Sequence, residues 1–353
     1  MARTQSEVKP ALLENILSQP RSLQQVAEYQ LGAGQDALLR CAETLRSSRR
    51  VVLSGMGASL FSCIPLSYML AERGVHALAV DTSELLYFLE PMLDRDTTVV
   101  LASRSGESVE VTKLLPILKQ RGCRTIGVFN VPGNTLAQHT HEQLLVNSPP
   151  DELVAIQTYT GTLAALALLG MACLGELDRA ERDVRRTIAS VERALTEFSS
   201  SDDAWREFSA GSEPVYFLGR GPSLASVNAG VLLMHEVAKM PAVGMSVPQF
   251  RHGPVEAVGK NFRAVVFGTQ PATEKLDLAL AQDLTRMGAQ VQWIGRRADE
   301  KTPTRFAPVL EMIPVQMLAY RLAESRGIAM GKFRYAPMIT LSEAGFANEA
   351  TGK

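Results

Sequence analysis

The chain has 353 residues, of which 21% are charged, and its net charge is −1. This balance argues against a broad electrostatic attraction to nucleic acid or to an anionic membrane surface. The length favours two domains over one. No signal peptide is predicted, because the first residues lead into no apolar core, and we expect a cytoplasmic protein.

The cysteines and histidines indicate neither disulfides nor a metal. All four cysteines lie in apolar surroundings without a CxxC spacing, which predicts buried free thiols: Cys41, Cys63, Cys123 and Cys173. His139 and His141 have no acidic or thiol cluster beside them, so we expect surface residues, no metal and no cofactor. The apolar stretch 163–174 is too short to span a bilayer and predicts a buried helix.

The first half of the chain alternates between helical and strand-like patterns. Residues 10–47 are helical in pattern, with a break at Pro20. Five apolar strands follow, with helices between them: 50–54, 77–80, 98–101, 125–129 and 143–146. This alternation predicts a mostly parallel sheet with helices on both faces, and such sheets bind ligands at the carboxyl ends of their strands.

Two polar loops fall at such strand ends. The turn Gly55-Met56-Gly57-Ala58-Ser59 follows the first strand, and Ser103-Arg104-Ser105-Gly106-Glu107-Ser108 lies between the third strand and a helix over 109–120. Hydroxyls beside the free amides of a helix start make a natural cradle for a phosphate. The alternative is an ordinary helix start capped by Ser105. Glu107 would repel a phosphate, so we interpret it as a structural residue.

The second half repeats the first after a long apolar helix, 154–174, an amphipathic connecting helix, 177–198, and a polar seam at 199–203. The strand 215–218 runs into Gly219-Arg220-Gly221-Pro222-Ser223, which matches the first turn glycine for glycine. Gly268-Thr269-Gln270-Pro271 replaces the serine loop, so we expect only the first half to hold the anion. The predicted segments are 1–48 (helical), 49–198 and 199–353.

Together these motifs resemble the sugar isomerase (SIS) domain family. The resemblance covers nearly the whole chain and includes Phe129-Asn130-Val131-Pro132-Gly133, His235-Glu236 and Phe250-Arg251-His252-Gly253-Pro254. It is greatest to the double-SIS isomerase half of glutamine–fructose-6-phosphate amidotransferases and to related deaminases and deglycases. It implies an α/β fold of two tandem SIS domains, each a flavodoxin-like three-layer unit with a mostly parallel sheet flanked by helices.

The resemblance also implies roles for individual residues. Glu236 matches the carboxylate that moves a proton between C1 and C2 of the sugar. His252 matches a histidine that helps to open the ring and that relatives receive from the other subunit of a homodimer. The remaining matches would line the sugar site or hold the 6-phosphate: Gly57, Ala58, Ser59, Ser103, Arg104, Ser105 and Ser108.

Several family positions differ in this chain. There is no room for an N-terminal glutaminase domain, so we expect no use of glutamine. Leu233 stands where the synthase has a lysine on the helix of Glu236, and its C-terminal lysine aligns near Pro337, with Lys332 out of register. Ala155 and Gln157 replace a serine and a lysine. The synthase mechanism is therefore not expected, whereas proton transfer by Glu236 is.

The residues themselves leave alternatives open. Glu236, in an apolar helix, is a plausible base with a raised pKa, or else pairs with Lys239 on a solvated face. His252 would shuttle a proton or cap a helix that begins near Pro254. Arg251 would pair with Glu256 or meet an anionic substrate. His235 should face away from its neighbour Glu236.

We therefore predict an enzyme that binds a 6-phosphorylated sugar or amino sugar and transfers a proton between aldose and ketose forms. Release of ammonia or an amine would make it a deaminase or deglycase. The alternative is a sugar-phosphate sensor without turnover, which the missing lysines would suit. We expect a homodimer with a shared active site, and no nucleic acid or membrane as partner.

Overall fold

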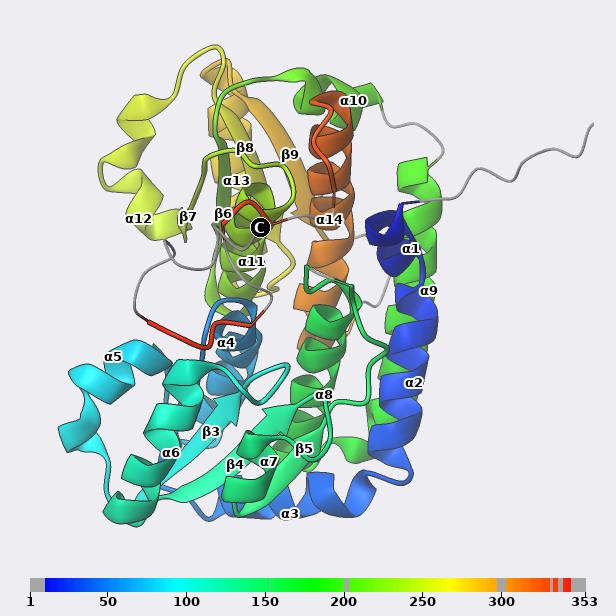
Figure 1. Ribbon diagram of the computed structural model, residues 1–353. Coiled ribbons are helices and arrows are strands. Elements are labelled where there is room, and N and C mark those ends of the chain that lie inside the picture. Colours follow the sequence, from blue (N-terminus) through cyan, green and yellow to red (C-terminus); the bar gives the residue numbers. More distant parts are fainter. Residues whose placement is uncertain are drawn as a thin grey trace, which may run out of the picture.

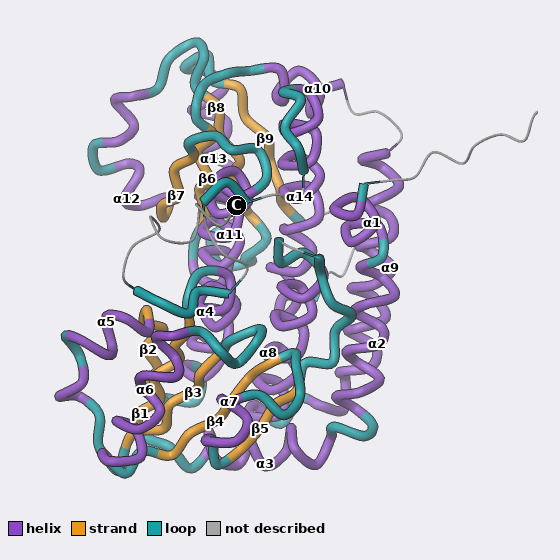
Figure 2. The backbone as a smooth tube through the Cα atoms, viewed as in Figure 1, coloured by secondary structure: helices purple, strands orange, loops and turns teal. Residues whose placement is uncertain are grey.

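The computed structural model describes residues 10–152, 154–199, 203–296, 303–330, 333–335 and 339–343. Two parallel sheets lie at opposite ends of the molecule, and helices enclose each of them (Figure 1). Figure 2 shows the same arrangement as strands in orange between helices in purple. Helices α4 and α11 occupy the region between the two sheets.

The first half contains helices α1 (Ala11–Leu17), α2 (Gln19–Leu31), α3 (Gln35–Arg46), α4 (Ala58–Ala71), α5 (Thr82–Tyr87), α6 (Val109–Arg121), α7 (Thr135–His139), α8 (Gln157–Leu174) and α9 (Ala180–Ser199). Its strands are β1 (Arg50–Gly55), β2 (His76–Asp81), β3 (Thr97–Ala102), β4 (Arg124–Phe129) and β5 (Glu142–Leu145). The second half contains α10 (Asp203–Ala210), α11 (Leu224–Glu236), α12 (Val247–Arg251), α13 (Glu274–Arg286) and α14 (Ala307–Ser325), with β6 (Val215–Gly219), β7 (Ala242–Ser246), β8 (Arg263–Gly268) and β9 (Gln290–Gly295).

The four strands of the second sheet follow the same order as the first four strands of the first sheet. The first runs β2-β1-β3-β4-β5 and the second β7-β6-β8-β9, and all the pairs are parallel. The central strands β3 and β8 are buried along their whole length, because helices cover both faces of a parallel sheet. The predicted fold class, a duplicated α/β unit, is confirmed.

One apolar core joins the halves. A single cluster of buried side chains includes Leu53 of β1, Leu168 of α8, Met234 of α11 and Leu318 of α14. Two smaller clusters fill the outer faces of the two sheets. The sheets therefore share their inner layer, and the boundaries at residues 48 and 198 stay predictions.

The structure moves two predicted helix boundaries. The break near Pro20 falls at Ser18, and the proline sits in the first turn of α2, where its missing N–H costs nothing. Helix α8 begins at Gln157, three residues later than predicted. The Asp151 carboxylate accepts hydrogen bonds from the amides of Ile156 and Thr158, both at 2.9 Å, and so fixes this start.

Helix α8 is the one described helix that is long and apolar enough to cross a membrane by length and composition, and 89% of it is buried inside the fold. That burial is typical of a core helix in a globular protein. The predicted state of the cysteines is confirmed, because all four are buried free thiols.

Candidate active site

The carboxyl edge of the first sheet brings the two predicted loops together. Gly55 at the end of β1 pairs in register with Ala102 at the end of β3. The turn Gly57–Ser59 and the serine loop 103–108 leave these neighbouring strand ends. The parallel register therefore places the two motifs side by side, as the sequence predicted.

The serine loop folds back on itself. Ser103, only 4% exposed, accepts a hydrogen bond from the Gly106 amide at 3.1 Å, and its hydroxyl lies 3.3 Å from that of Ser108. Ser105 accepts from the Glu107 amide at 3.2 Å. Gly106 makes the reversal possible with a φ of 73°. Ser105 and Ser108 are half-buried.

The alternative of an ordinary capped helix does not fit. Ser108, not Ser105, is the residue before α6, and its side chain makes no capping hydrogen bond. The first amide of α6, that of Val109, instead donates to the Thr340 carbonyl at 3.0 Å. The loop is thus a distinct structure before the helix, and its serines are not used up in capping it.

Glu107 is the structural residue that the sequence predicted. Its carboxylate accepts hydrogen bonds from the Thr135 amide and hydroxyl, both at 2.7 Å. These bonds from Thr135 lower the pKa of the Glu107 carboxyl. The acidic group therefore anchors the loop to the start of α7.

A C-terminal segment lies against the loop. Besides the Val109–Thr340 bond, Glu343 pairs with Lys113 of α6 and accepts from the Tyr87 hydroxyl at 2.6 Å. In Figure 1 this short red segment passes between α5 and α4. Residues more than 200 positions apart in the chain thus meet at α6, directly after the serine loop.

Glu236 belongs to the second half but lies close to the loops of the first. It is the last residue of α11, one turn beyond Leu232 on the same face. A Cβ on Gly57 would lie 3.8 Å from the Leu232 side chain, so this face of α11 borders the glycine turn. Glu236 is half-buried and His235 is exposed, but both line the cavity described below, so the expectation that His235 faces away is wrong.

The surroundings of Glu236 tune its acidity. Burial raises the pKa of its carboxyl to about 7, against the opposing charges of Lys239 and Arg104. Arg104 is part of the serine loop, so a cation from the predicted phosphate cradle acts on the predicted base. A carboxyl with this pKa can accept and return a proton at neutral pH.

An open cavity of about 540 Å³ lies beside Glu236. Its lining comes from the end of α11 and from the C-terminal segment: His235, Glu236, Lys239, Met240, Pro241, Phe333, Arg334 and Tyr335. Within the described residues, Lys239 forms no ion pair with the Glu236 carboxylate, which was one alternative from the sequence. Its amine donates to the Glu236 backbone carbonyl at 2.6 Å.

The structure does not bring His252 to this cavity within one chain. His252 follows α12, is exposed, and within the described residues its ring makes no hydrogen bond. Within the same part of the chain, Arg251 and Glu256 form no ion pair. The helix expected near Pro254 is a short 3-10 turn, Pro254–Ala257. Lys332 and Pro337 lie outside the described residues.

The second half has a hydroxyl cluster of its own, but a carboxylate of the same chain occupies it. Ser223 and Ser226 donate to the Glu311 carboxylate, Ser223 at 2.6 Å, and Thr269 does the same. Glu311 comes from α14 and is fully buried. Burial raises the pKa of its carboxyl against these three hydrogen bonds. An internal carboxylate thus lies where the first half has its open loop.

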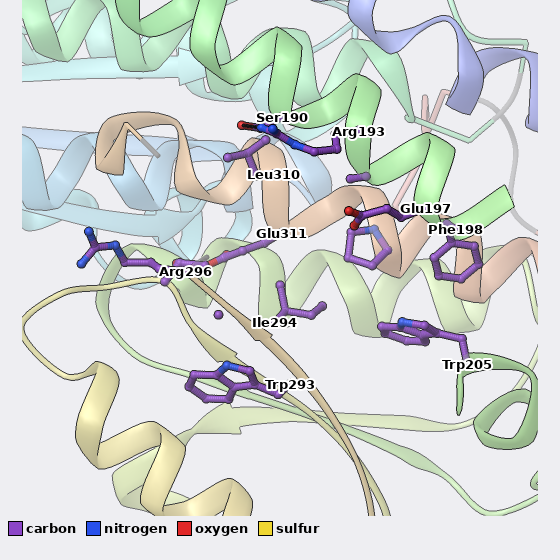
Figure 3. A pocket seen from close by; sticks show the side chains of 14 residues that line it. Ser190, Arg193, Glu197, Phe198, Trp205, Trp293, Ile294, Arg296, Leu310 and Glu311 are labelled. Carbon is purple, nitrogen blue, oxygen red and sulfur yellow. Dashed lines mark hydrogen bonds between the residues drawn. The ribbon is translucent and has the colours of Figure 1, made fainter. Parts of the chain in front are cut away.

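Figure 3 shows Glu311 beside a pocket of about 270 Å³, with Trp293 and Arg296 near it. Sequence reasoning missed this arrangement because Glu311 follows Thr269 by 42 positions and belongs to another element. The Glu311 carboxylate reaches the carboxyl end of β8 from helix α14, and no local sequence pattern connects this helix to that strand.

The fold and the site define a double α/β protein with a serine-rich loop at a strand end of one half and the Glu236 carboxylate of the other half near it. Residues 44–172 match the SIS domain family. The first half of the chain therefore carries a SIS domain, as its motifs indicated.

Curated relatives and solved structures extend the similarity beyond residue 172. The chain is 26% identical over 333 residues to glutamine–fructose-6-phosphate aminotransferase (isomerizing) of Pyrobaculum aerophilum, covering 90% of this chain and 55% of the relative. The Pyrococcus horikoshii protein of that name is also 26% identical, over 336 residues, which cover 90% and 55%. The chain thus spans about half the length of the curated relatives it matches.

Three solved structures share the whole fold. The C-terminal domain of glucosamine-fructose-6-phosphate aminotransferase from Francisella tularensis superposes with a TM-score of 0.80 at 19% identity, covering 94% of this chain and all of that domain. Glucosamine-6-phosphate deaminase from Thermotoga maritima gives 0.76 at 20% identity, with coverages of 94% and 99%. Tagatose-6-phosphate ketose/aldose isomerase from Escherichia coli gives 0.72 at 19%, with coverages of 94% and 98%.

Proposed function

We propose that this protein is a phosphosugar enzyme that moves a proton between adjacent carbons of an open-chain 6-phosphorylated sugar or amino sugar. The observation that carries the proposal is the proximity of the two halves of the site. Arg104 of the serine loop acts on the Glu236 carboxyl, whose pKa is raised to about 7. Leu232, one turn before Glu236, also borders the glycine turn, so the proposed base lies near both predicted loops.

In this proposal the serine loop binds the phosphate. Ser103 holds the loop in shape, while Ser105, Ser108 and the Arg104 guanidinium donate to the phosphate oxygens. Gly57, Ala58 and Ser59 line the sugar chain, because a glycine turn lets backbone amides approach it closely. Glu236 takes the proton from the carbon next to the carbonyl and returns it to the neighbouring carbon.

The names of similar proteins support the substrate class but not a single reaction. They include an isomerizing aminotransferase, a deaminase and a ketose/aldose isomerase, which all act on sugar 6-phosphates by name. Proton transfer between C1 and C2 is a step that isomerisation and deamination of such sugars can share. We therefore propose the proton transfer itself, and loss of ammonia or an amine would be an additional step of the reaction.

The proposal is tested by incubating the purified protein in deuterated water with glucosamine-6-phosphate, fructose-6-phosphate, glucose-6-phosphate and a fructose-amino-acid 6-phosphate. NMR should show deuterium entering at C1 or C2 of at least one of them. The products and any ammonia separate isomerase, deaminase and deglycase. Thermal stabilisation by one sugar without any exchange would instead favour a sensor and contradict the proposal.

We also propose that the active site is shared within a homodimer, because exposed His252 lies outside the Glu236 cavity of its own chain. Glu236→Gln and His252→Ala should each be inactive alone. Mixed after dissociation, they should form heterodimers in which one site has both wild-type groups, and up to about a quarter of the wild-type activity should return.

The exchange rate of the mixture is the measurement, and the two variants mixed without prior dissociation are the control. A mixture that stays inactive after confirmed subunit exchange would contradict the shared site. So would a protein that is active as a monomer at the assay concentration.

A further inference from the structure

Lys239 stands in an unusual backbone conformation directly beside the candidate base. Its φ is 51°, and in the described part of the chain Asn147 is the only other non-glycine residue with a positive φ. A lysine held in this left-handed region is strained relative to an ordinary conformation. Glycine would remove that strain, so the conformation suggests that the side chain has a use.

The contacts of Lys239 hold its amine at the cavity wall. Nζ donates to the Glu236 carbonyl at 2.6 Å and lies 5.5 Å from the centre of the Phe333 ring. Both Glu236 and Phe333 line the same cavity as Lys239. An ammonium has three N–H groups, and within the described residues only one of them is used in a hydrogen bond. The others are available to a molecule in the cavity.

We propose that Lys239 is a further catalytic residue, whose ammonium binds the carbonyl oxygen of the open-chain sugar while the Glu236 carboxylate attacks the adjacent C–H. This inference rests on the proposed function and identifies the group that transfers protons to and from the sugar oxygens O1 and O2. Negative charge develops on that oxygen when the proton leaves carbon, and a cation already aimed at it lowers the barrier.

The proton balance of the step is complete. For an aldose, Glu236 removes the proton on C2, the C–H electron pair forms the C1–C2 double bond, and the carbonyl pair moves to O1. Lys239 gives a proton to O1, and the resulting amine takes the proton of the C2 hydroxyl as the C2 carbonyl forms. Glu236 then returns its proton to C1. Both residues end as they began.

The charges around Lys239 suit a group that gives and regains a proton. Burial and the nearby Arg334 lower the pKa of its amine, and Glu236 opposes them. The groups that act on Glu236 are Lys239 itself and Arg104. Removing the Lys239 charge should therefore raise the Glu236 pKa further and move the acidic limb of kcat/KM to higher pH by about half a unit or more.

Lys239→Met and Lys239→Gly test the proposal against Lys275→Met, a matched charge removal at an exposed site on α13. Both Lys239 variants should lose about 100-fold in kcat for deuterium exchange with little change in KM, and their acidic limb should shift. Glycine relieves the left-handed strain, so Lys239→Gly should be at least as stable as wild type in urea. Methylammonium should restore part of its activity, whereas tetramethylammonium, without an N–H, should not.

Wild-type kcat in both Lys239 variants would overturn this inference alone, since wild-type exchange would still support the proposed function. A covalent Lys239–sugar adduct trapped by borohydride would also overturn it, because the amine would then form an imine rather than bind oxygen. Absence of exchange by the wild-type protein with every sugar phosphate would overturn the proposed function and this inference together.

Discussion

Replacing Glu236 with Gln should abolish deuterium exchange while sugar-phosphate binding persists. The amide has nearly the same size but cannot accept the carbon-bound proton, and loss of a general base lowers rates by about 10²–10⁴-fold. Exchange followed by NMR gives the rate, and calorimetric titration with the active sugar phosphate gives the affinity. Glu28→Gln, an exposed change on α2, is the matched control and should leave both values unchanged.

The Glu236→Gln variant, although inactive, should be more stable than the wild-type protein at high pH. Because the folded-state pKa of about 7 exceeds the ordinary value of 4.5, the folded protein binds more protons than the unfolded chain between these values. Stability therefore falls as pH rises through this window. Gln cannot ionise, so Glu236→Gln should be more stable than wild type at pH 8 by about 2 kcal/mol, after a discount for partial exposure, and nearly equal at pH 4.5.

Urea unfolding at the two pH values measures this difference. If Glu236→Gln is less stable than wild type at pH 8, the ionised Glu236 carboxylate does not destabilise the folded protein, and the prediction is wrong. Wild-type exchange in Glu236→Gln would remove Glu236 from the mechanism altogether.

Replacing Gly106 with Ala should disable the phosphate cradle. The residue has a φ of 73°, and a Cβ there would overlap the amide group of Asn134. Asn134 in turn caps α7, accepting from the Ala137 amide at 2.7 Å, and Gly106 accepts from the Leu136 amide at 3.2 Å. The loop therefore has to move, and the serine hydroxyls move with it.

We expect Gly106→Ala to weaken sugar-phosphate binding by at least about 10-fold and to lower the free energy of unfolding by about 3 kcal/mol. Gly175→Ala is the matched control, since Gly175 has a φ of 74° but no atom within 4 Å of a Cβ. It should cost only about 1 kcal/mol, from backbone strain, and leave binding unchanged. Equal losses in the two variants would mean that strain, not the contact with Asn134, governs the loop.

The local patterns of the sequence predicted much of the fold. Buried parallel strands are short apolar runs, so β3 and β4 were predicted within a residue of their observed bounds. The glycine turn and the serine loop were found because polar residues follow such runs directly. The start of α8 was missed because Asp151 fixes it from outside the helix, through hydrogen bonds that no periodicity reveals.

The sequence by itself thus determined the elements, their duplication and the chemical character of the first loop, because these depend on residues close together in the chain. Only the tertiary structure decided which charges meet. It brings Arg104 of the first half close enough to affect the pKa of Glu236 in the second half. It also places Glu311 where hydroxyls of the second half donate to it, and the Thr340 carbonyl where it accepts from the first amide of α6. Such contacts depend on how helices pack over one shared core, and residues 42 to 231 positions apart carry no local signal of that packing.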